Sequence, residues 1–164
     1  MSFQFYVTIE GGSQGKFKGE VAEKDLANKI GGLAFDFEVT APYDKATGMS
    51  SGKRQMFPVK FVKEWGAASP QIFQALTQNE VIKSVLFEFY RSVPQGGRVC
   101  YYTIKLTNGK IVHYHQFVNT AARQQLVIEG STTHELEEVA FVFQKIDVEN
   151  KDAKTMATDT AWPS

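Results

Sequence analysis

The sequence predicts a mainly β protein, a two-sheet antiparallel β-barrel with one short α-helix on one side. Apolar and polar residues alternate with a period of two in several separate segments, which is typical of strands with one buried face. Aromatic residues favour strands, and the 164 residues include thirteen phenylalanines and six tyrosines. One segment carries helix-start signals, whereas turn residues separate roughly eight or nine expected strands, as in a small barrel or sandwich.

Two clean alternating segments lie in the first 40 residues, at 3–10 and 33–40. In the first, the expected inward side chains are Phe3, Phe5, Val7 and Ile9. In the second, they are Leu33, Phe35, Phe37 and Val39. A weaker strand is predicted at 17–24, after the glycine-rich turn at 11–15.

Residues 52–90 organise the chain as strand, short helix and strand. The helix is expected to begin at Ser69-Pro70, because a serine oxygen can accept an orphan backbone N–H and proline suits the first helical position. The expected inward stripe of the helix is Ile72, Phe73 and Leu76. The flanking strands place inward Phe57, Val59 and Phe61, and then Val85, Phe87 and Phe89.

A hairpin is predicted around Asn108-Gly109, because this dipeptide is the strongest short-range hairpin signal. It would join strands at 98–107 and 110–119. With a two-residue loop, one face carries Cys100, Tyr102, Ile104, Leu106, Ile111, His113, His115 and Phe117. The other face, which includes Tyr114 and Val118, is not plainly polar either. We therefore expect the core to cover one face and another chain to cover the other.

The last third is expected to contain a short strand at 125–130 and a final strand at 138–146, with Val139, Phe141 and Phe143 inward. Residues 147–164 form a polar C-terminal tail of a composition that is normally disordered, and Trp162 is its candidate anchor. Residues 41–55 cannot bury a face and should project as a loop, either as a solvated connection or as a contact arm for a neighbouring subunit. The length fits a single domain at 1–164.

The charge balance argues against a nucleic-acid or membrane partner. Lysine plus arginine (18) equals aspartate plus glutamate (18), so the chain has no electrostatic footprint for nucleic acid or an anionic membrane. No apolar run is long enough to span a bilayer, and the first residues alternate like a strand instead of resembling a secretory signal peptide. A single cysteine, Cys100, fits folding in a reducing cytoplasm.

The sequence shows no catalytic centre, so we expect no enzyme activity, cofactor or metal. The strongest competing hypothesis is a small-ligand- or metal-binding β-barrel, cupin-like or lipocalin-like, in which His113 and His115 face a cavity. His134 is the candidate third ligand, and the predicted pairing places no acid beside the two histidines. Cys100 is expected to be a buried, inert thiol, because it lies on an apolar strand face away from any base.

A series of motifs in order resembles the haemolysin-coregulated protein (Hcp) family, the tube subunits of bacterial type VI secretion. The central motifs are Gly52-Lys53-Arg54-Gln55, KEWGAASP at 63–70 and FQAL at 73–76. Further matches are 16–20, VLFEFYR at 85–91, YTIKLTN at 102–108 and LEEVAFVFQKI at 136–146. The chain departs from the family pattern at Val21, Met56 and Asp147-Val148.

The resemblance implies hexameric rings that stack into a tube and are secreted with effectors in the lumen. The implied partners are a VgrG-like spike protein, a contractile sheath and effector proteins, with neither nucleic acid nor membrane insertion. The protein would be made in the bacterial cytoplasm and exported through type VI secretion without a signal peptide. The candidate oligomer-interface residues are Tyr43, Asp44, Lys45, Lys53, Arg54, Met56, Tyr114 and Trp162.

Overall fold

The computed structural model describes residues 4–21, 24–118 and 135–161, and its strand pairs are antiparallel. The elements are β1 (Phe5–Gly11), β2 (Gly15–Lys16), the 3-10 helix η1 (Lys24–Leu26), β3 (Ile30–Gly32), β4 (Ala34–Asp36), β5 (Val39–Thr40), β6 (Gln55–Met56), β7 (Val59–Glu64), α1 (Ser69–Thr77), β8 (Ile82–Ser92), β9 (Arg98–Val118), β10 (Glu135–Asn150) and β11 (Thr155–Thr160). The prediction of a mainly β, antiparallel fold with one short α-helix is confirmed.

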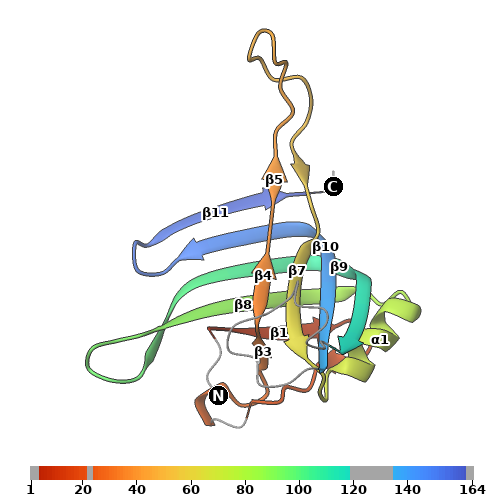
Figure 1. The fold of residues 1–164 in the computed structure, drawn as a ribbon, viewed down its shortest axis with the longest axis vertical. Coiled ribbons are helices and arrows are strands. Elements are labelled where there is room, and N and C mark those ends of the chain that lie inside the picture. The colour runs from red at the N-terminus through yellow and green to blue at the C-terminus, as the bar shows by residue number, and fades with distance from the viewer. Residues whose placement is uncertain (1–3, 22–23, 119–134, 162–164) are drawn as a thin grey trace.

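Residues 30–36 join the two ends of the main sheet (Figure 1). The sheet order is β2-β1-β8-β9-β10-β7-β4. β3 pairs with β1 while β4 pairs with β7, and Leu33 between them donates its backbone N–H to the Val62 carbonyl at 2.8 Å. The hydrogen-bonded path therefore returns to β1, as in a barrel, while β5 and β6 form a separate two-stranded sheet.

Phenylalanine rings fill the interior between the strands. Phe61 stacks on Phe141 at a centroid distance of 5.9 Å, and Phe87 meets both rings edge-on at 5.7 and 6.4 Å. Val7, Ile9 and Val139 are fully buried around them, so these period-2 predictions are confirmed. Each such side chain stabilises the fold by about 1.5–3 kcal/mol relative to an exposed one.

Helix α1 packs on β9, and of the predicted stripe Ile72 is buried and Leu76 packs, partly buried, against the core. Ser69, Ile72 and Ala75, spaced three residues apart, are buried, whereas Phe73 is 56% exposed. Ser69 is the first helical residue and Ala68 precedes it, so the predicted serine cap is wrong. The Ser69 hydroxyl accepts the backbone N–H of Gly66 at 3.0 Å instead.

The predicted hairpin at Asn108-Gly109 is wrong, because β9 runs through this dipeptide as one strand of 21 residues. Gly109 pairs with β8 on one side and with β10 on the other. A Cβ atom at Gly109 would lie 2.4 Å from the Val142 carbonyl oxygen, so glycine permits the close approach of β10. Asn108 adopts a left-handed φ of 57°, and its side-chain amide donates to Gln144 at 2.7 Å. The dipeptide therefore marks unusual backbone geometry within a strand, not a chain reversal.

An irregularity between β9 and β10 also overturns the predicted faces of residues 112–118. Ala140 pairs with His113, but Phe141 pairs with Ile111, which leaves Val112 without an opposite residue. Such a β-bulge changes which side chains face inward along the rest of the strand. Tyr114 consequently packs against the core, whereas the two histidines of β9 are exposed.

Three further predictions have other outcomes, and two lie outside the described residues. Residues 17–24 contain no strand among the described positions, and η1 begins at Lys24. The segment 33–40 is divided between β4 and β5, and Val39 is 45% exposed where the chain leaves the barrel. Residues 147–160 continue β10 and add β11 as an antiparallel hairpin. The predicted strand at 125–130 and the candidate anchor Trp162 lie outside the described residues.

Candidate functional site

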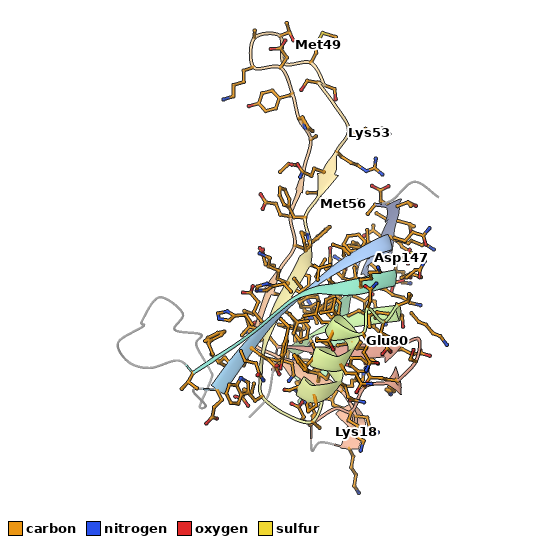
Figure 2. All side chains as sticks on the ribbon, turned by 90° about the vertical axis from the view of Figure 1, so that its right-hand side faces the viewer. Lys18, Met49, Lys53, Met56, Glu80 and Asp147 are labelled. Atoms are coloured by element: carbon orange, nitrogen blue, oxygen red, sulfur yellow. The ribbon has the colours of Figure 1, made fainter. Side chains whose placement is uncertain are left out.

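The arm, residues 39–56, extends away from the barrel (Figures 1 and 2). All residues from 39 to 55 are exposed, and β5 and β6 pair at its base. The tip holds its own shape, because the Asp44 N–H donates to the Met49 carbonyl at 2.7 Å and the Gly48 N–H donates to the Asp44 carbonyl at 2.7 Å. Tyr43 and Met49 are 62% and 69% exposed there. The arm is therefore a shaped element that offers apolar side chains to solvent.

Six of the predicted interface residues belong to this arm. Tyr43, Asp44 and Lys45 lie in the exposed outer half, and Lys53 and Arg54 lie on the exposed returning limb. The half-buried Met56 stands at the base and packs against the core. Arg54 already has a partner within the chain, because its guanidinium pairs with Asp159 of β11.

The remaining two candidates do not join the arm. Tyr114 lies on β9, half-buried, with its ring 6.4 Å from that of Phe73 on α1. Burial, followed by the neighbouring Glu137 carboxylate, raises the pKa of Tyr114. Trp162 lies outside the described residues.

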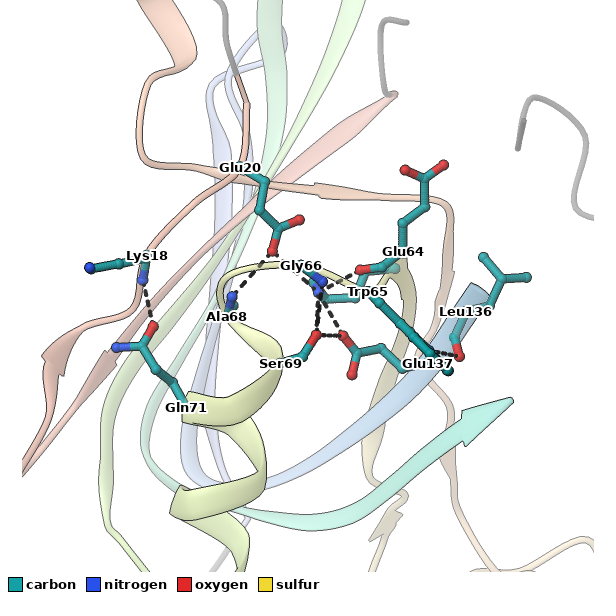
Figure 3. Close-up of polar contacts among 11 residues, drawn as sticks. Lys18, Glu20, Glu64, Trp65, Gly66, Ala68, Ser69, Gln71, Leu136 and Glu137 are labelled. Atoms are coloured by element: carbon teal, nitrogen blue, oxygen red, sulfur yellow. Dashed lines mark hydrogen bonds and ion pairs between the residues drawn. The ribbon is translucent and has the colours of Figure 1, made fainter. Parts of the chain in front are cut away.

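A buried ion pair that the sequence reading did not single out joins β7 to β10 (Figure 3). The Lys63 ammonium lies 2.7 Å from Glu137 Oε1, and both side chains are fully buried. Lys63 also donates to the Glu64 carbonyl at 2.6 Å, and the Ser69 hydroxyl donates to Glu137. The sequence did contain a signal for this pair: Lys63 occupies the next inward position after Val59 and Phe61 in the same alternation, and a lysine on a buried face needs an acidic partner.

Further hydrogen bonds stabilise the turn between β7 and α1 next to this pair (Figure 3). Glu20 accepts the Ala68 backbone N–H at 3.2 Å and lies 3.4 Å from the Lys63 ammonium. The Trp65 indole N–H donates to the Leu136 carbonyl at 2.7 Å. Because these groups bond to each other inside the protein, the arrangement positions α1 against the barrel.

The two histidines of β9 do not face a cavity, so the geometry expected for a metal- or ligand-binding barrel is wrong. The His113 and His115 rings lie 6.2 Å apart among exposed residues. Glu138 Oε1 is 3.8 Å from His113 Nε2, contrary to the expectation that no acid lies beside them. Within the described parts of the chain, no group of three or more histidine, cysteine, aspartate or glutamate side chains could hold a metal. The candidate ligand His134 lies outside those parts.

Cys100 is a half-buried free thiol on β9. Its sulfur lies 3.7 Å from the Tyr102 carbonyl oxygen, to which the thiol donates. Burial raises the pKa of this thiol, which disfavours the reactive thiolate.

Glu80 holds the glycine-rich turn after β1 to the end of α1. Its carboxylate accepts the backbone N–H groups of Ser13 at 3.1 Å and Gln14 at 3.0 Å, and also the Gln14 side-chain amide at 3.0 Å. Burial alone would raise the pKa of Glu80, but the bonds from Gln14 and Ser13 together outweigh burial and lower it below 4.5. Ionised Glu80 therefore stabilises the fold above pH 4.5, and this stabilisation is lost as the pH falls through the lowered pKa.

We expect Glu80→Gln to lower the free energy of unfolding at pH 7 by about 1–2 kcal/mol, since charge-assisted hydrogen bonds are lost. The difference from the unmodified protein should shrink as the pH is lowered from 7 toward 3, because the stabilisation by the ionised carboxylate is lost as the pH falls through the lowered pKa of Glu80. Urea unfolding at both pH values measures it, with the exposed Glu38→Gln as the matched control. A difference that is the same at both pH values would contradict this assignment.

Comparison with known proteins shows that both the sequence and the fold of this chain are similar to those of one family. The family model described as "Type VI secretion system effector, Hcp" matches residues 6–149. The major exported protein of Pseudomonas aeruginosa PAO1 is 29% identical over 173 residues, which covers 100% of this chain and 98% of that protein. Among the described residues, no helix combines the length and apolar character needed to cross a membrane.

Solved structures show the same architecture over nearly the whole chain. The Hcp1 protein of Escherichia coli EAEC 042 superimposes with a TM-score of 0.84 at 26% identity, covering 98% of this chain and 100% of that chain. The secreted protein Hcp3 of Pseudomonas aeruginosa superimposes with a TM-score of 0.78 at 24% identity, covering 99% and 100%. Because the family model spans most of the sequence and the fold agrees, this chain belongs to the Hcp family of type VI secretion proteins.

Proposed function

We propose that this chain is a structural subunit of the type VI secretion inner tube. Six copies form a ring, rings stack into a hollow tube, and the tube is exported with effector proteins in its lumen. The family match over residues 6–149 carries this proposal. A contractile sheath and a VgrG-like spike protein are its further partners, and its role is mechanical instead of catalytic.

The arm supports an assembly role. Its hydrogen-bonded tip exposes Tyr43 and Met49, and tyrosine and methionine are among the residues enriched at protein interfaces. A shaped element loses little conformational entropy when it docks, so its exposed side chains can add binding energy efficiently. The partner that fits is another copy of this chain.

Head-to-tail contacts between copies close into a ring when the rotation between subunits divides evenly. Two standard contacts of about 800 Å² each would cover roughly a sixth of the subunit surface of 10072 Å². This leaves enough surface for stacking, for a lumen and for an outer wall. Export fits the name of the major exported protein to which the chain is similar.

The oligomeric state of the purified protein tests the proposal. We expect size-exclusion chromatography with light scattering to give a mass six times that of the 18.4 kDa chain, and negative-stain images to show rings. The stained rings should have a central opening. A protein that remains a single chain at high concentration would contradict the proposed function.

A further inference from the structure

A bidentate ion pair between Arg54 and Asp159 connects the arm to β11, near the C-terminus. Arg54 Nε lies 2.5 Å from Asp159 Oδ2, and Arg54 Nη2 lies 2.6 Å from Asp159 Oδ1. Arg54 Nη2 also donates to the Thr160 carbonyl at 2.9 Å. This parallel geometry fixes direction as well as distance, in contrast to a single-point contact.

Asp159 is held in place by the hairpin that carries it. It pairs with Ile146 in the ladder between β10 and β11. The Thr158 hydroxyl donates to Asp147 at 2.6 Å, and the Ala161 N–H donates to the Gln144 carbonyl at 2.7 Å. The hairpin therefore holds the Asp159 carboxylate in a fixed position, and Arg54 of the arm binds to it there.

At its base the arm packs against the core through the half-buried Met56. A pocket of about 240 Å³ separates the arm from the barrel there. Its lining residues are Arg54, Gln55, Met56, Phe57, Val142, Phe143 and Ala161. Among the described residues, the side-chain hydrogen bonds that join residues 41–54 to the barrel or to its β10–β11 hairpin are those of Arg54. Beyond the packing of Met56 at the base, the direction of the arm therefore depends on the contacts of Arg54.

We propose that Arg54 and Asp159 are positioning residues, which latch the arm to the β10–β11 hairpin and thereby set the geometry in which one subunit meets the next. This inference rests on the proposed assembly function and deepens it. The effect on folding is small, because surface ion pairs contribute little to stability. The effect on docking appears directly in the affinity between subunits, because the apparent affinity falls in proportion to the fraction of molecules whose arm points correctly.

Among the described residues, the nearby charged groups Lys145 and Asp147 have partners of their own. Lys145 lies 3.9 Å from Asp147 on the same hairpin, and Asp147 also accepts the Thr158 hydroxyl. The hydrogen bond from Arg54 is the largest cause that lowers the pKa of Asp159, so the carboxylate stays ionised near neutral pH. The latch should therefore respond to salt more than to pH. At about 1 M salt the screening length falls to about 3 Å, which weakens an exposed pair.

The direction of the arm can be measured within one subunit. Spin labels at Met49→Cys on the arm and Met156→Cys on β11, both exposed positions, report the distance between them in a Cys100→Ser background. Labelled chains diluted in unlabelled protein remove distances between subunits. We expect Arg54→Gln and Asp159→Asn each to broaden the distance distribution about twofold, since the arm then samples other directions. Lys145→Gln, the matched control on the same hairpin, should leave it narrow. An unchanged width in both latch variants would overturn the inference.

Assembly supplies the second measurement. We expect Arg54→Gln and Asp159→Asn each to raise the dissociation constant between subunits about two- to fivefold, which corresponds to the loss of one surface ion pair. The exchanged pair, Arg54→Asp with Asp159→Arg, should recover part of this loss. If Arg54→Gln weakens assembly but Asp159→Asn does not, Arg54 contacts the neighbour directly and the latch is rejected.

The two proposals fail in different ways. If the unmodified protein never forms rings, the proposed function and the assembly role of the latch both fall, whereas the spin-label distances still decide whether the ion pair directs the arm. If rings form with normal affinity in both latch variants, the proposed function stands and the latch is rejected.

Discussion

Replacing Lys63 by methionine is expected to lower the free energy of unfolding by about 3–5 kcal/mol, because it leaves the buried Glu137 carboxylate without its cation. Both side chains of this pair are fully buried, so water cannot take the place of the lost partner. The Ser69 hydroxyl would remain, but one neutral donor compensates only part of the desolvation of a carboxylate.

Urea denaturation measures this loss, with Lys60→Met as the matched control on the same strand. Lys60 is exposed, so its replacement should change the unfolding free energy by about 0.5 kcal/mol or less. The double variant Lys63→Met with Glu137→Met should recover most of the stability, because a buried ion pair can be exchanged for apolar side chains at little net cost. A loss below about 1 kcal/mol in the single variant would show that the pair is dispensable.

Deleting residues 43–52 is expected to abolish ring formation and to leave a folded monomer. The Ser51 N–H donates to the Pro42 carbonyl at 3.1 Å, so the two limbs of the arm lie close enough to be joined directly. The removed residues are all exposed and bury nothing in the core, so the free energy of unfolding should stay nearly constant. Size-exclusion chromatography with light scattering gives the mass, and thermal unfolding gives the stability.

A pair of single substitutions controls for the size of this deletion. Met49→Ser removes an exposed methionine from the arm tip, whereas Met156→Ser removes one of similar exposure from β11. We expect the first substitution to weaken assembly by about tenfold, as for the loss of an apolar interface anchor, and the second to have little effect. Unchanged ring formation after deletion of the arm would exclude the arm as an assembly element.

Local patterns in the sequence identified much of the fold. Val7 and Ile9 on β1, and Val85 and Phe87 on β8, are buried as their alternation predicted, because a strand with one covered face records that face in every second residue. The exposed arm followed from a run of polar, glycine and serine residues that cannot bury a face. The family was recognisable because its motifs occur in the expected order along the chain.

Other predictions failed because they depend on which strands pair with a given strand on its two edges. Asn108-Gly109 carries the chemistry of a turn, but β8 and β10 pair with β9 at this glycine and the strand continues through it. The bulge at Val112 has no marker in the residues themselves. The predicted ladder therefore grouped the two histidines with Ile111 and placed Tyr114 on the opposite face, and the structure reverses this grouping.

The fold class, most inward faces of the early strands and the family could be predicted from the residues alone, because each depends on residues that are near one another in the chain. The partners of the charged groups became visible only in the three-dimensional fold. Lys63 and Glu137 are 74 positions apart, and Arg54 and Asp159 are 105 positions apart. No local periodicity specifies which distant strands become neighbours, and strand pairing brought these charges within hydrogen-bonding distance.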